Sequence, residues 1–180
     1  VIPSQRTIPA NLLDPKIKNR SRIHYQMANI EVSEYPGNNN WALLLDTDGF
    51  ISEGTGDNFF IVKNGIVITP EPRNILRGIS RQYIFSLCKD LDIQCIEKNI
   101  EPYDVYTADE AFMTGTPFCI LPVSSLNFQK IGHSITGYIT DKLLKRWSEI
   151  VKVDIVRQIK NYAEETNYSL NGSTPYQFKK

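Results

Sequence analysis

Glu53-Gly-Thr-Gly-Asp-Asn-Phe-Phe60 leads from a carboxylate through small turn residues into an apolar run that predicts a buried strand. Ile75-Leu-Arg-Gly-Ile-Ser-Arg81 then predicts the start of a helix, and Met113-Thr-Gly-Thr-Pro117 predicts a turn after a further strand. Free N–H groups at a helix start bind anions, and a small turn with two hydroxyls can do the same. Together the three stretches could hold a phosphorylated aromatic cofactor, with the carboxylate at its ring.

The composition is that of one ordinary globular domain. The chain has 180 residues, of which 41% are hydrophobic and 22% charged, with 20 basic and 20 acidic side chains. A chain of this length can bury one substantial core, and its zero net charge argues against nucleic acid as the main partner. No apolar run approaches the roughly 20 residues that span a bilayer, and no leader opens the sequence. We therefore expect a cytoplasmic protein without a membrane partner.

The helices expected from hydrophobic spacing lie at residues 19–34, 78–91 and 135–164, and the last of these regions breaks near Val153. Lys18 would then lie directly before the first helix. Strands are expected at residues 41–45, 58–62, 66–69, 93–96, 111–113 and 119–123. Lys63-Asn-Gly65 predicts a hairpin, because Asn-Gly supplies the positive φ angles that such turns need. No composition shift marks a second domain, so the order predicts one mixed α/β domain.

Two other features concern the cysteines and the start of the chain. Cys88, Cys95 and Cys119 each lie in an apolar stretch without the paired spacing of a metal site. We expect reduced core thiols, rather than ligands or nucleophiles, and no metal. The opening Val1-Ile-Pro lacks Met and is typical of a connector, which suggests that an N-terminal portion is missing.

Each candidate functional residue also has an ordinary structural explanation. Ser80 could simply cap its helix, and Thr114-Gly115-Thr116 could satisfy only its own backbone. Glu53 could be a solvated carboxylate beside a turn. Lys18 could belong to one solvated basic face, formed with Lys16, Arg20 and Arg22. Only the order in which all of these groups follow one another along the chain favours a functional site over these structural explanations.

That order resembles the fold type IV pyridoxal-phosphate enzymes, the class IV group of branched-chain aminotransferases, D-amino acid aminotransferases and aminodeoxychorismate lyase. The resemblance runs from about residue 14 to residue 123. Lys18 in Asp14-Pro-Lys-Ile-Lys-Asn-Arg-Ser-Arg-Ile-His-Tyr25 is similar to the family's Schiff-base lysine, with Ala28 and Glu31 at matching spacing. Glu53, followed by Asn58-Phe-Phe60, is similar to the acid that contacts the pyridine nitrogen.

The remaining matches concern the phosphate. Leu76 is similar to the leucine that packs on the cofactor ring, and the residues after it resemble the family's phosphate-binding segment. Gly115 and Thr116 are similar to the last phosphate-side turn. The resemblance thus implies Lys18 as the catalytic residue, and a pyridoxal 5'-phosphate site formed by Lys18, Glu53, Asn58, Leu76, Gly78, Ile79, Ser80, Gly115 and Thr116.

The resemblance also implies an architecture. Residues 14–165 would be the large cofactor-binding domain of the D-amino acid aminotransferase-like fold, a mixed sheet or barrel flanked by helices. Residues 1–13 would be an interdomain connector, and residues 166–180 a polar tail. The family's smaller N-terminal domain, which supplies an arginine to the cofactor phosphate, is not found in this sequence. Family members pair across the active site, so a homodimer is expected.

The implied function is transamination between an amino acid, possibly branched-chain or D-configured, and a 2-oxo acid through a Schiff base on Lys18. Two alternatives stay open: an elimination like that of aminodeoxychorismate lyase, and a noncatalytic fragment that binds cofactor or a partner. Arg22 is expected to form a structural ion pair rather than a substrate contact, and His24 to have a helix-surface or core role. Pro117-Phe118 departs from the small pair of branched-chain enzymes, which leaves the substrate shape open.

Overall fold

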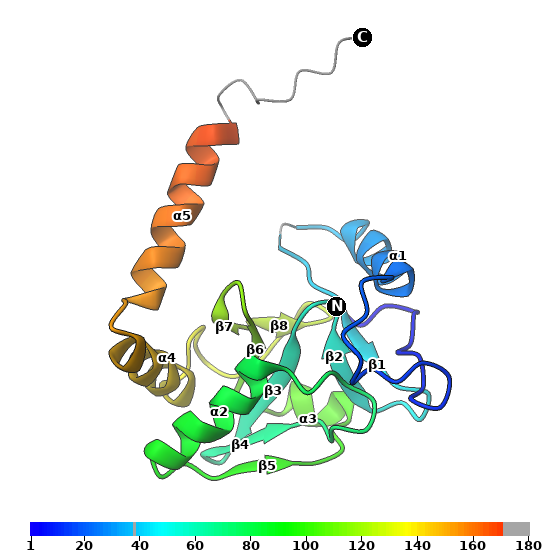
Figure 1. Ribbon diagram of the computed structural model, residues 1–180, viewed down its shortest axis with the longest axis horizontal. Helices are drawn as coiled ribbons and strands as arrows, with labels where there is room; N and C mark the ends of the chain where they lie inside the picture. The colour runs from blue at the N-terminus through cyan, green and yellow to red at the C-terminus, as the bar shows by residue number, and fades with distance from the viewer. Residues whose placement is uncertain (38, 171–180) are drawn as a thin grey trace.

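A mixed seven-stranded sheet with helices on both faces forms the body of the computed structural model (Figure 1), which describes residues 1–37 and 39–170. The predicted mixed α/β fold is confirmed. In chain order the elements are α1 (Ile23–Ser33), β1 (Leu43–Leu45), β2 (Ile51–Gly54), β3 (Asn58–Lys63), β4 (Ile66–Thr69), α2 (Ile79–Asp90), β5 (Cys95–Glu97), α3 (Pro102–Tyr106), β6 (Glu110–Gly115), β7 (Cys119–Pro122), β8 (Ser125–Leu126), β9 (Gln129–Lys130), α4 (Tyr138–Val151) and α5 (Ile155–Leu170).

Strand β3 organises the sheet because both of its edges are paired. One edge runs antiparallel to β6 along five residue pairs, from Asn58↔Thr114 to Val62↔Glu110. The other edge meets β2 at Glu53↔Asn58 and β4 over the last three residues of β3. The first residue of β3 therefore lies between a residue of β2 and a residue of β6. The candidate site forms at this end of the paired strands.

The core lies on both faces of this sheet, because successive strand residues point to opposite sides. Phe60 and Phe112 stack at 4.9 Å between ring centroids on the face that α2 and α4 cover. Phe59 and Met113 belong to the other face, where they join residues of the α3 region in a second cluster. Each fully buried large apolar side chain contributes about 1.5–3 kcal/mol, so both faces hold β3 and β6 in place.

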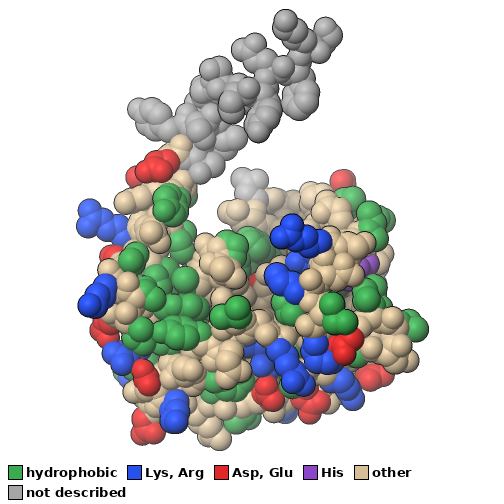
Figure 2. Space-filling view, viewed as in Figure 1, with side chains coloured by type: hydrophobic (Ala, Val, Ile, Leu, Met, Phe, Trp, Pro, Cys, Tyr) green, Lys and Arg blue, Asp and Glu red, His purple; other side chains and the backbone are tan. Residues whose placement is uncertain are grey.

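Two local predictions are confirmed by backbone angles. Asn64 and Gly65 have φ angles of 50° and 78°, as a two-residue hairpin between β3 and β4 requires. The break near Val153 occurs at Lys152, whose left-handed φ of 57° ends α4. Beyond it α5 extends away from the body (Figure 1), and apolar side chains gather over α4 in Figure 2.

Helix α1 begins later than the sequence indicated. It starts at Ile23, whereas the hydrophobic spacing predicted residue 19. The reason is local: the Asn19 side chain accepts a hydrogen bond from the Ser21 N–H at 2.7 Å, and such a turn competes with helix formation. Lys18 therefore lies in a loop, not directly before the helix.

Other elements differ in extent or were not predicted. Strand β1 excludes Trp41, which is 40% exposed. Four elements, β2, α3, β8 and β9, were not predicted. Helix α3 starts with Pro102 and a reciprocal capping box between Glu101 and Asp104. The segment expected to be a connector lies along β1, where the Thr7 N–H donates to the Leu45 carbonyl. Helix α5 continues to Leu170, so it enters the segment predicted as a tail; residues 171–180 lie outside the described part.

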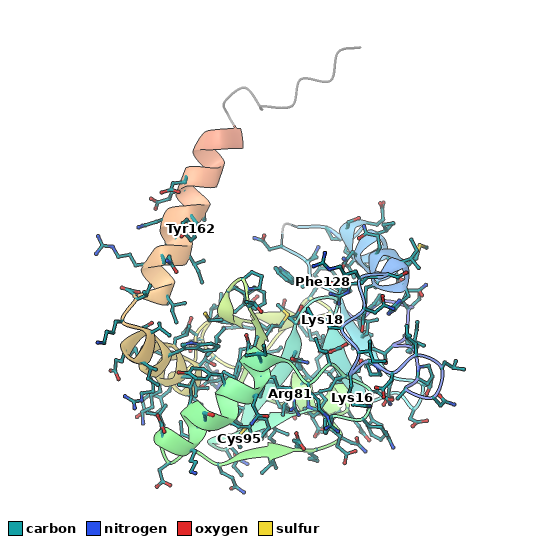
Figure 3. All side chains as sticks on the ribbon, viewed as in Figure 1. Lys16, Lys18, Arg81, Cys95, Phe128 and Tyr162 are labelled. Carbon is teal, nitrogen blue, oxygen red and sulfur yellow. The ribbon has the colours of Figure 1, made fainter. Side chains whose placement is uncertain are left out.

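The cysteines are free thiols. Cys88 is buried as predicted, whereas Cys95 (Figure 3) and Cys119 are half-buried. Hydrogen bonding to Cys88 and burial raise the pKa of Cys95, which favours its thiol form. Within residues 1–37 and 39–170, no cluster of three or more His, Cys, Asp or Glu side chains could hold a metal. Nor does any helix described there have the length and apolarity needed to cross a bilayer.

Candidate active site

All nine residues predicted for the cofactor site line one cavity of about 170 Å³. They come from four separate segments: the loop before α1, the β2–β3 connection, the start of α2 and the end of β6. The cavity also includes six residues that the sequence analysis did not assign to it, namely Arg22, Gly54, Gly56, Asp57, Arg77 and Thr114. Residues up to 98 positions apart in the chain therefore form one site.

Strand pairing places three polar side chains in a row across the sheet. Glu53 of β2 pairs with Asn58 of β3, and Asn58 pairs with Thr114 of β6. Paired residues of antiparallel strands point to the same face. A carboxylate, an amide and a hydroxyl therefore lie on the same face of the sheet, at the ends of these strands. Glu53 lies within β2, rather than in the turn that follows it.

Glu53 is only 4% exposed, and both of its oxygens accept hydrogen bonds. Oε1 accepts from the Tyr25 hydroxyl at 2.7 Å. Oε2 accepts from the Leu76 N–H at 2.9 Å and from the Asn58 amide at 3.3 Å. The burial of Glu53 contradicts the alternative of a solvated surface carboxylate. Its hydrogen bonds offset the free-energy cost of burying a charged group.

The charge of Glu53 results from opposing effects. Burial raises the pKa of its carboxyl, since a charged group is poorly solvated inside a protein. The hydrogen bonds from Tyr25 and the Leu76 N–H lower this pKa, as do the positive charges of Arg22 and Lys18. The surrounding donors therefore favour the ionised carboxylate that burial disfavours.

Helix α2 begins beside this carboxylate, with Gly78 as its N-cap residue. The first N–H groups of an α-helix have no partners within the helix and carry a partial positive charge. Gly78 has an ordinary φ of −63°, but a Cβ atom there would overlap Oδ1 of Asn58. Glycine is thus required for close packing, and it lets Asn58 also donate to the Leu76 carbonyl at 2.9 Å.

The β6–β7 turn completes the same end of the cavity. The Thr114 hydroxyl is buried and has no hydrogen-bond partner among the described residues, so it could accept or donate to a bound group. A Cβ on Gly115 would lie 3.0 Å from the Phe118 ring. Phe118 in turn packs edge-on against Trp41, with centroids 5.7 Å apart. The aromatic pair therefore supports the turn that carries Thr116.

Lys18 and Lys16 lie in the same loop but in different surroundings (Figure 3). The Lys16 amine pairs with Asp14 at 2.8 Å and donates to the Arg73 carbonyl at 3.1 Å. Lys18 lines the cavity and makes no hydrogen bond or ion pair within the described part of the chain. Lys16 is therefore held by Asp14 and the Arg73 carbonyl, whereas the exposed Lys18 is the lysine whose amine is available at the cavity.

The prediction that Arg22 forms an ion pair was wrong for the described residues. Its guanidinium donates to the Thr55 carbonyl and lies 4.7 Å from the centroid of the Tyr25 ring. The His24 ring contacts Tyr25 as well, at 4.1 Å, in agreement with a role on the α1 helix. The geometry of α1 thus directs Arg22 and Tyr25 to the site. No short motif signals this, because Tyr25 and Glu53 are 28 residues apart.

Asp57 is one of the cavity residues that were not predicted, although it lies inside Glu53-Gly-Thr-Gly-Asp-Asn-Phe-Phe60. It is 6% exposed, and neither carboxyl oxygen has a hydrogen-bond partner in the described part of the chain. Burial raises its pKa to about 7, and the charge of Glu53 adds to this, whereas the nearby Gly56 N–H and Arg22 lower it.

Comparison with known proteins gives a consistent result. Residues 1–126 match the family model described as amino-transferase class IV. The chain is 40% identical over 148 residues to a Methanocaldococcus jannaschii protein with a provisional branched-chain-amino-acid aminotransferase name, covering 82% of this chain and 51% of that one. It is 40% identical over 110 residues to the branched-chain-amino-acid aminotransferase of Pseudomonas aeruginosa, covering 61% and 36% of the two chains.

Solved structures are similar in fold. The branched-chain amino acid aminotransferase of Thermobaculum terrenum, in its PLP-bound holo form, has a TM-score of 0.78 and 32% identity over 83% of this chain and 49% of that one. The chain spans about half the length of the M. jannaschii relative and of the T. terrenum structure.

Proposed function

The chain belongs to the class IV aminotransferase family, and from this premise we propose that it forms the cofactor-binding part of a pyridoxal-phosphate-dependent aminotransferase. The reaction would move an amino group between an amino acid, branched-chain or D-configured, and a 2-oxo acid. Because the match to this chain covers only about half of the M. jannaschii relative, activity, substrates and partners are all part of the proposal.

One observation carries this proposal: a buried carboxylate, a helix start and a lysine amine that has no partner among the described residues line the same cavity. Pyridoxal phosphate has groups that suit all three. Its ring nitrogen suits Glu53, its phosphate suits the start of α2, and its aldehyde suits Lys18. The donor chemistry of the cavity therefore fits this cofactor.

The phosphate end is proposed to lie between α2 and the β6–β7 turn. The N–H groups of Ile79 and Ser80 are directed out of the helix start, where a phosphate is favoured by the helix dipole. The hydroxyls of Ser80 and Thr116 add donors, and Gly78 and Gly115 keep the backbone accessible. Arg77, which lines the cavity between Leu76 and Gly78, adds positive charge.

The ring end is proposed to lie against Glu53 and Leu76. Glu53 would accept the N–H of the pyridine ring, and the hydrogen-bonded position of its carboxylate would fix the ring's orientation. Asn58 would hold Glu53 and the Leu76 backbone together. The Leu76 side chain would give the ring an apolar contact.

When bound, pyridoxal phosphate supplies an aldehyde that accepts an amino group and a ring that accepts the electron pair released at the substrate Cα. Lys18 is proposed to attach the cofactor covalently in the resting enzyme and, as a free amine, to move a proton to or from that Cα.

The remaining parts of the proposal are a homodimer in the cytoplasm, with residues 14–165 as the cofactor-binding domain. Sedimentation of the full-length protein at several concentrations tests the dimer, and a single monomeric species at all of them would contradict it. Cell fractionation tests the compartment. Limited proteolysis tests the boundary, since a stable product should include residues 14–165.

The central experiment is to add pyridoxal phosphate to the full-length protein, reduce with borohydride and map the labelled lysine by mass spectrometry. Lys18 should carry the label, while Lys16 is the matched control two residues away. Labelling only at other lysines, or none at all, would overturn the proposal.

The reaction class needs a second measurement. A panel of L-branched-chain and D-amino acids, with 2-oxo acids as acceptors, should yield new 2-oxo acids in amounts equal to the amino acids formed. Release of pyruvate from aminodeoxychorismate, without transfer to any acceptor, would replace transamination with the elimination reaction.

A further inference from the structure

The Glu53 carboxylate has a limited number of acceptor positions. A carboxylate offers about four lone-pair positions, two on each oxygen. The Leu76 N–H and the Asn58 amide take both positions on Oε2. The Tyr25 hydroxyl takes one on Oε1, at 2.7 Å. Within residues 1–37 and 39–170, one acceptor position is therefore left, and it lies on the same oxygen that Tyr25 contacts.

Tyr25 is well suited to be a permanent donor to that oxygen. Burial and the negative charge of Glu53 raise the pKa of its phenol, so the hydroxyl keeps its proton throughout the physiological range. The Arg22 guanidinium lies over its ring at 4.7 Å and also donates to the Thr55 carbonyl. The phenol is thus held between a cation on its ring face and a carboxylate at its hydroxyl.

We propose that Tyr25 is a positioning residue for Glu53: its hydroxyl orients the carboxylate and leaves a single acceptor position on Oε1 for the ring N–H of the bound ligand. This inference rests on the proposed function, because it assigns the remaining position to the cofactor ring. Tyr25 does not itself need to touch the ligand. Its contribution acts through the carboxylate.

A purely structural role for Tyr25 has different consequences. If the hydroxyl only anchored α1 to the sheet, its removal would weaken cofactor binding to the same extent with or without the Glu53 carboxylate. If it positions Glu53, removal leaves the carboxylate with fewer donors in the same buried surroundings, so its pKa rises, and the loss of cofactor affinity requires that carboxylate. The two roles are therefore separated by measuring the titration of Glu53 together with the dependence of cofactor binding on Glu53.

The first test needs no cofactor. Carboxyl carbon-13 NMR of the full-length protein, with the Glu53 signal assigned by its loss in Glu53→Gln, gives the titration midpoint of Glu53. Tyr25→Phe should raise this midpoint by about one pH unit, a typical effect of one hydrogen bond to a charged group. Tyr103→Phe, which changes an exposed tyrosine on α3, is the control and should leave it unchanged.

A second variant protects the test against loss of structure. Fluorotyrosine at position 25 keeps the ring and hydroxyl but is a stronger donor, so it should lower the Glu53 midpoint. Opposite shifts of the Glu53 titration midpoint for Tyr25→Phe and for fluorotyrosine support a positioning role of Tyr25. An unchanged midpoint in both variants overturns that role.

The third measurement is the dissociation constant of pyridoxal phosphate in a double-mutant cycle. Tyr25→Phe should weaken binding about tenfold with Glu53 present, and less than twofold in a Glu53→Gln background. Equal weakening in both backgrounds would overturn the inference. If the unsubstituted protein binds no pyridoxal phosphate but the NMR shifts occur, the proposed function fails and the effect of Tyr25 on Glu53 stands. If it binds and Tyr25→Phe changes nothing, only the inference fails.

Discussion

Gly78 packs so closely against Asn58 that a Cβ atom at position 78 would overlap the Asn58 Oδ1 atom. The backbone at Gly78 has an ordinary negative φ, so any residue could adopt it. The close approach alone requires glycine. Since Asn58 bonds to both Glu53 and the Leu76 carbonyl, this packing joins the helix start to the carboxylate.

Gly78→Ala should therefore displace the Asn58 side chain. We expect a loss of about 1–3 kcal/mol in the free energy of unfolding, with weaker binding of pyridoxal phosphate. Urea unfolding and cofactor titration measure the two effects. Gly56→Ala is the stability control, because a Cβ there meets nothing within 4 Å. Equal stability losses in both variants would contradict the packing argument.

Glu53→Gln should separate cofactor binding from turnover. The phosphate contacts proposed for Ser80 and Thr116 do not involve Glu53, so the cofactor should stay bound. Amino transfer should fall about 100-fold, because a neutral amide stabilises positive charge on the ring nitrogen far less than a carboxylate does. Single-turnover absorbance measures this step. A Glu53→Gln enzyme with unchanged turnover would exclude this role.

Local residue patterns were sufficient to predict those parts of the molecule that depend on neighbours in sequence. Asn64-Gly65 predicted its hairpin through positive φ angles, and Gly78 predicted the start of α2. The predicted binding residues likewise line one cavity; those of the Glu53, Gly78 and Gly115 motifs lie at or next to the ends of β2, β3, β6 and α2, whereas Lys18 lies in a loop. Their functional roles stay predictions.

Features that depend on distant contacts were not predictable in this way. Tyr25 reaches Glu53 only because α1 packs against Leu44 of β1, the strand that pairs with β2. The Asx turn at Asn19 determines where that helix begins. Asp57 stands next to a predicted residue, but its burial follows from the β2–β3 connection. The hydrophobic periodicity of a sequence does not indicate which residues surround a single carboxylate.

Glu110 on β6 makes a further long-range contact, which should stabilise the fold without affecting cofactor binding. Its carboxylate accepts hydrogen bonds from the N–H groups of Ile139 and Thr140 and from the Thr140 hydroxyl, all at 2.6–2.8 Å. It thus caps the start of α4 from another element. Glu110→Ala should cost about 2 kcal/mol of unfolding free energy and leave pyridoxal phosphate affinity unchanged. Glu149→Ala, at an exposed position of α4, is the control for urea unfolding. A large loss of cofactor affinity in Glu110→Ala would contradict this separation.

Asp57 should make the stability of the protein depend on pH. Burial raises its pKa in the folded protein from 3.8 to about 7. Between these values the unfolded chain has released the proton, while the folded protein still holds it. The folded state then binds more protons, so the free energy of unfolding decreases as the pH rises from about 4 to about 7.

Asp57→Asn should remove this contribution, because an amide has no proton to release in that range. Relative to the unsubstituted protein, the variant should gain about 2–3 kcal/mol of unfolding free energy between pH 5 and pH 8. Urea unfolding of both proteins without cofactor at the two pH values measures the gain. Asp92→Asn is the matched control: Asp92 is exposed, and its left-handed φ of 54° is one that asparagine tolerates. The difference in unfolding free energy between Asp57→Asn and the unsubstituted protein could instead be the same at pH 5 and pH 8. That result would show that Asp57 is already ionised at pH 5, which would require a donor to its carboxylate.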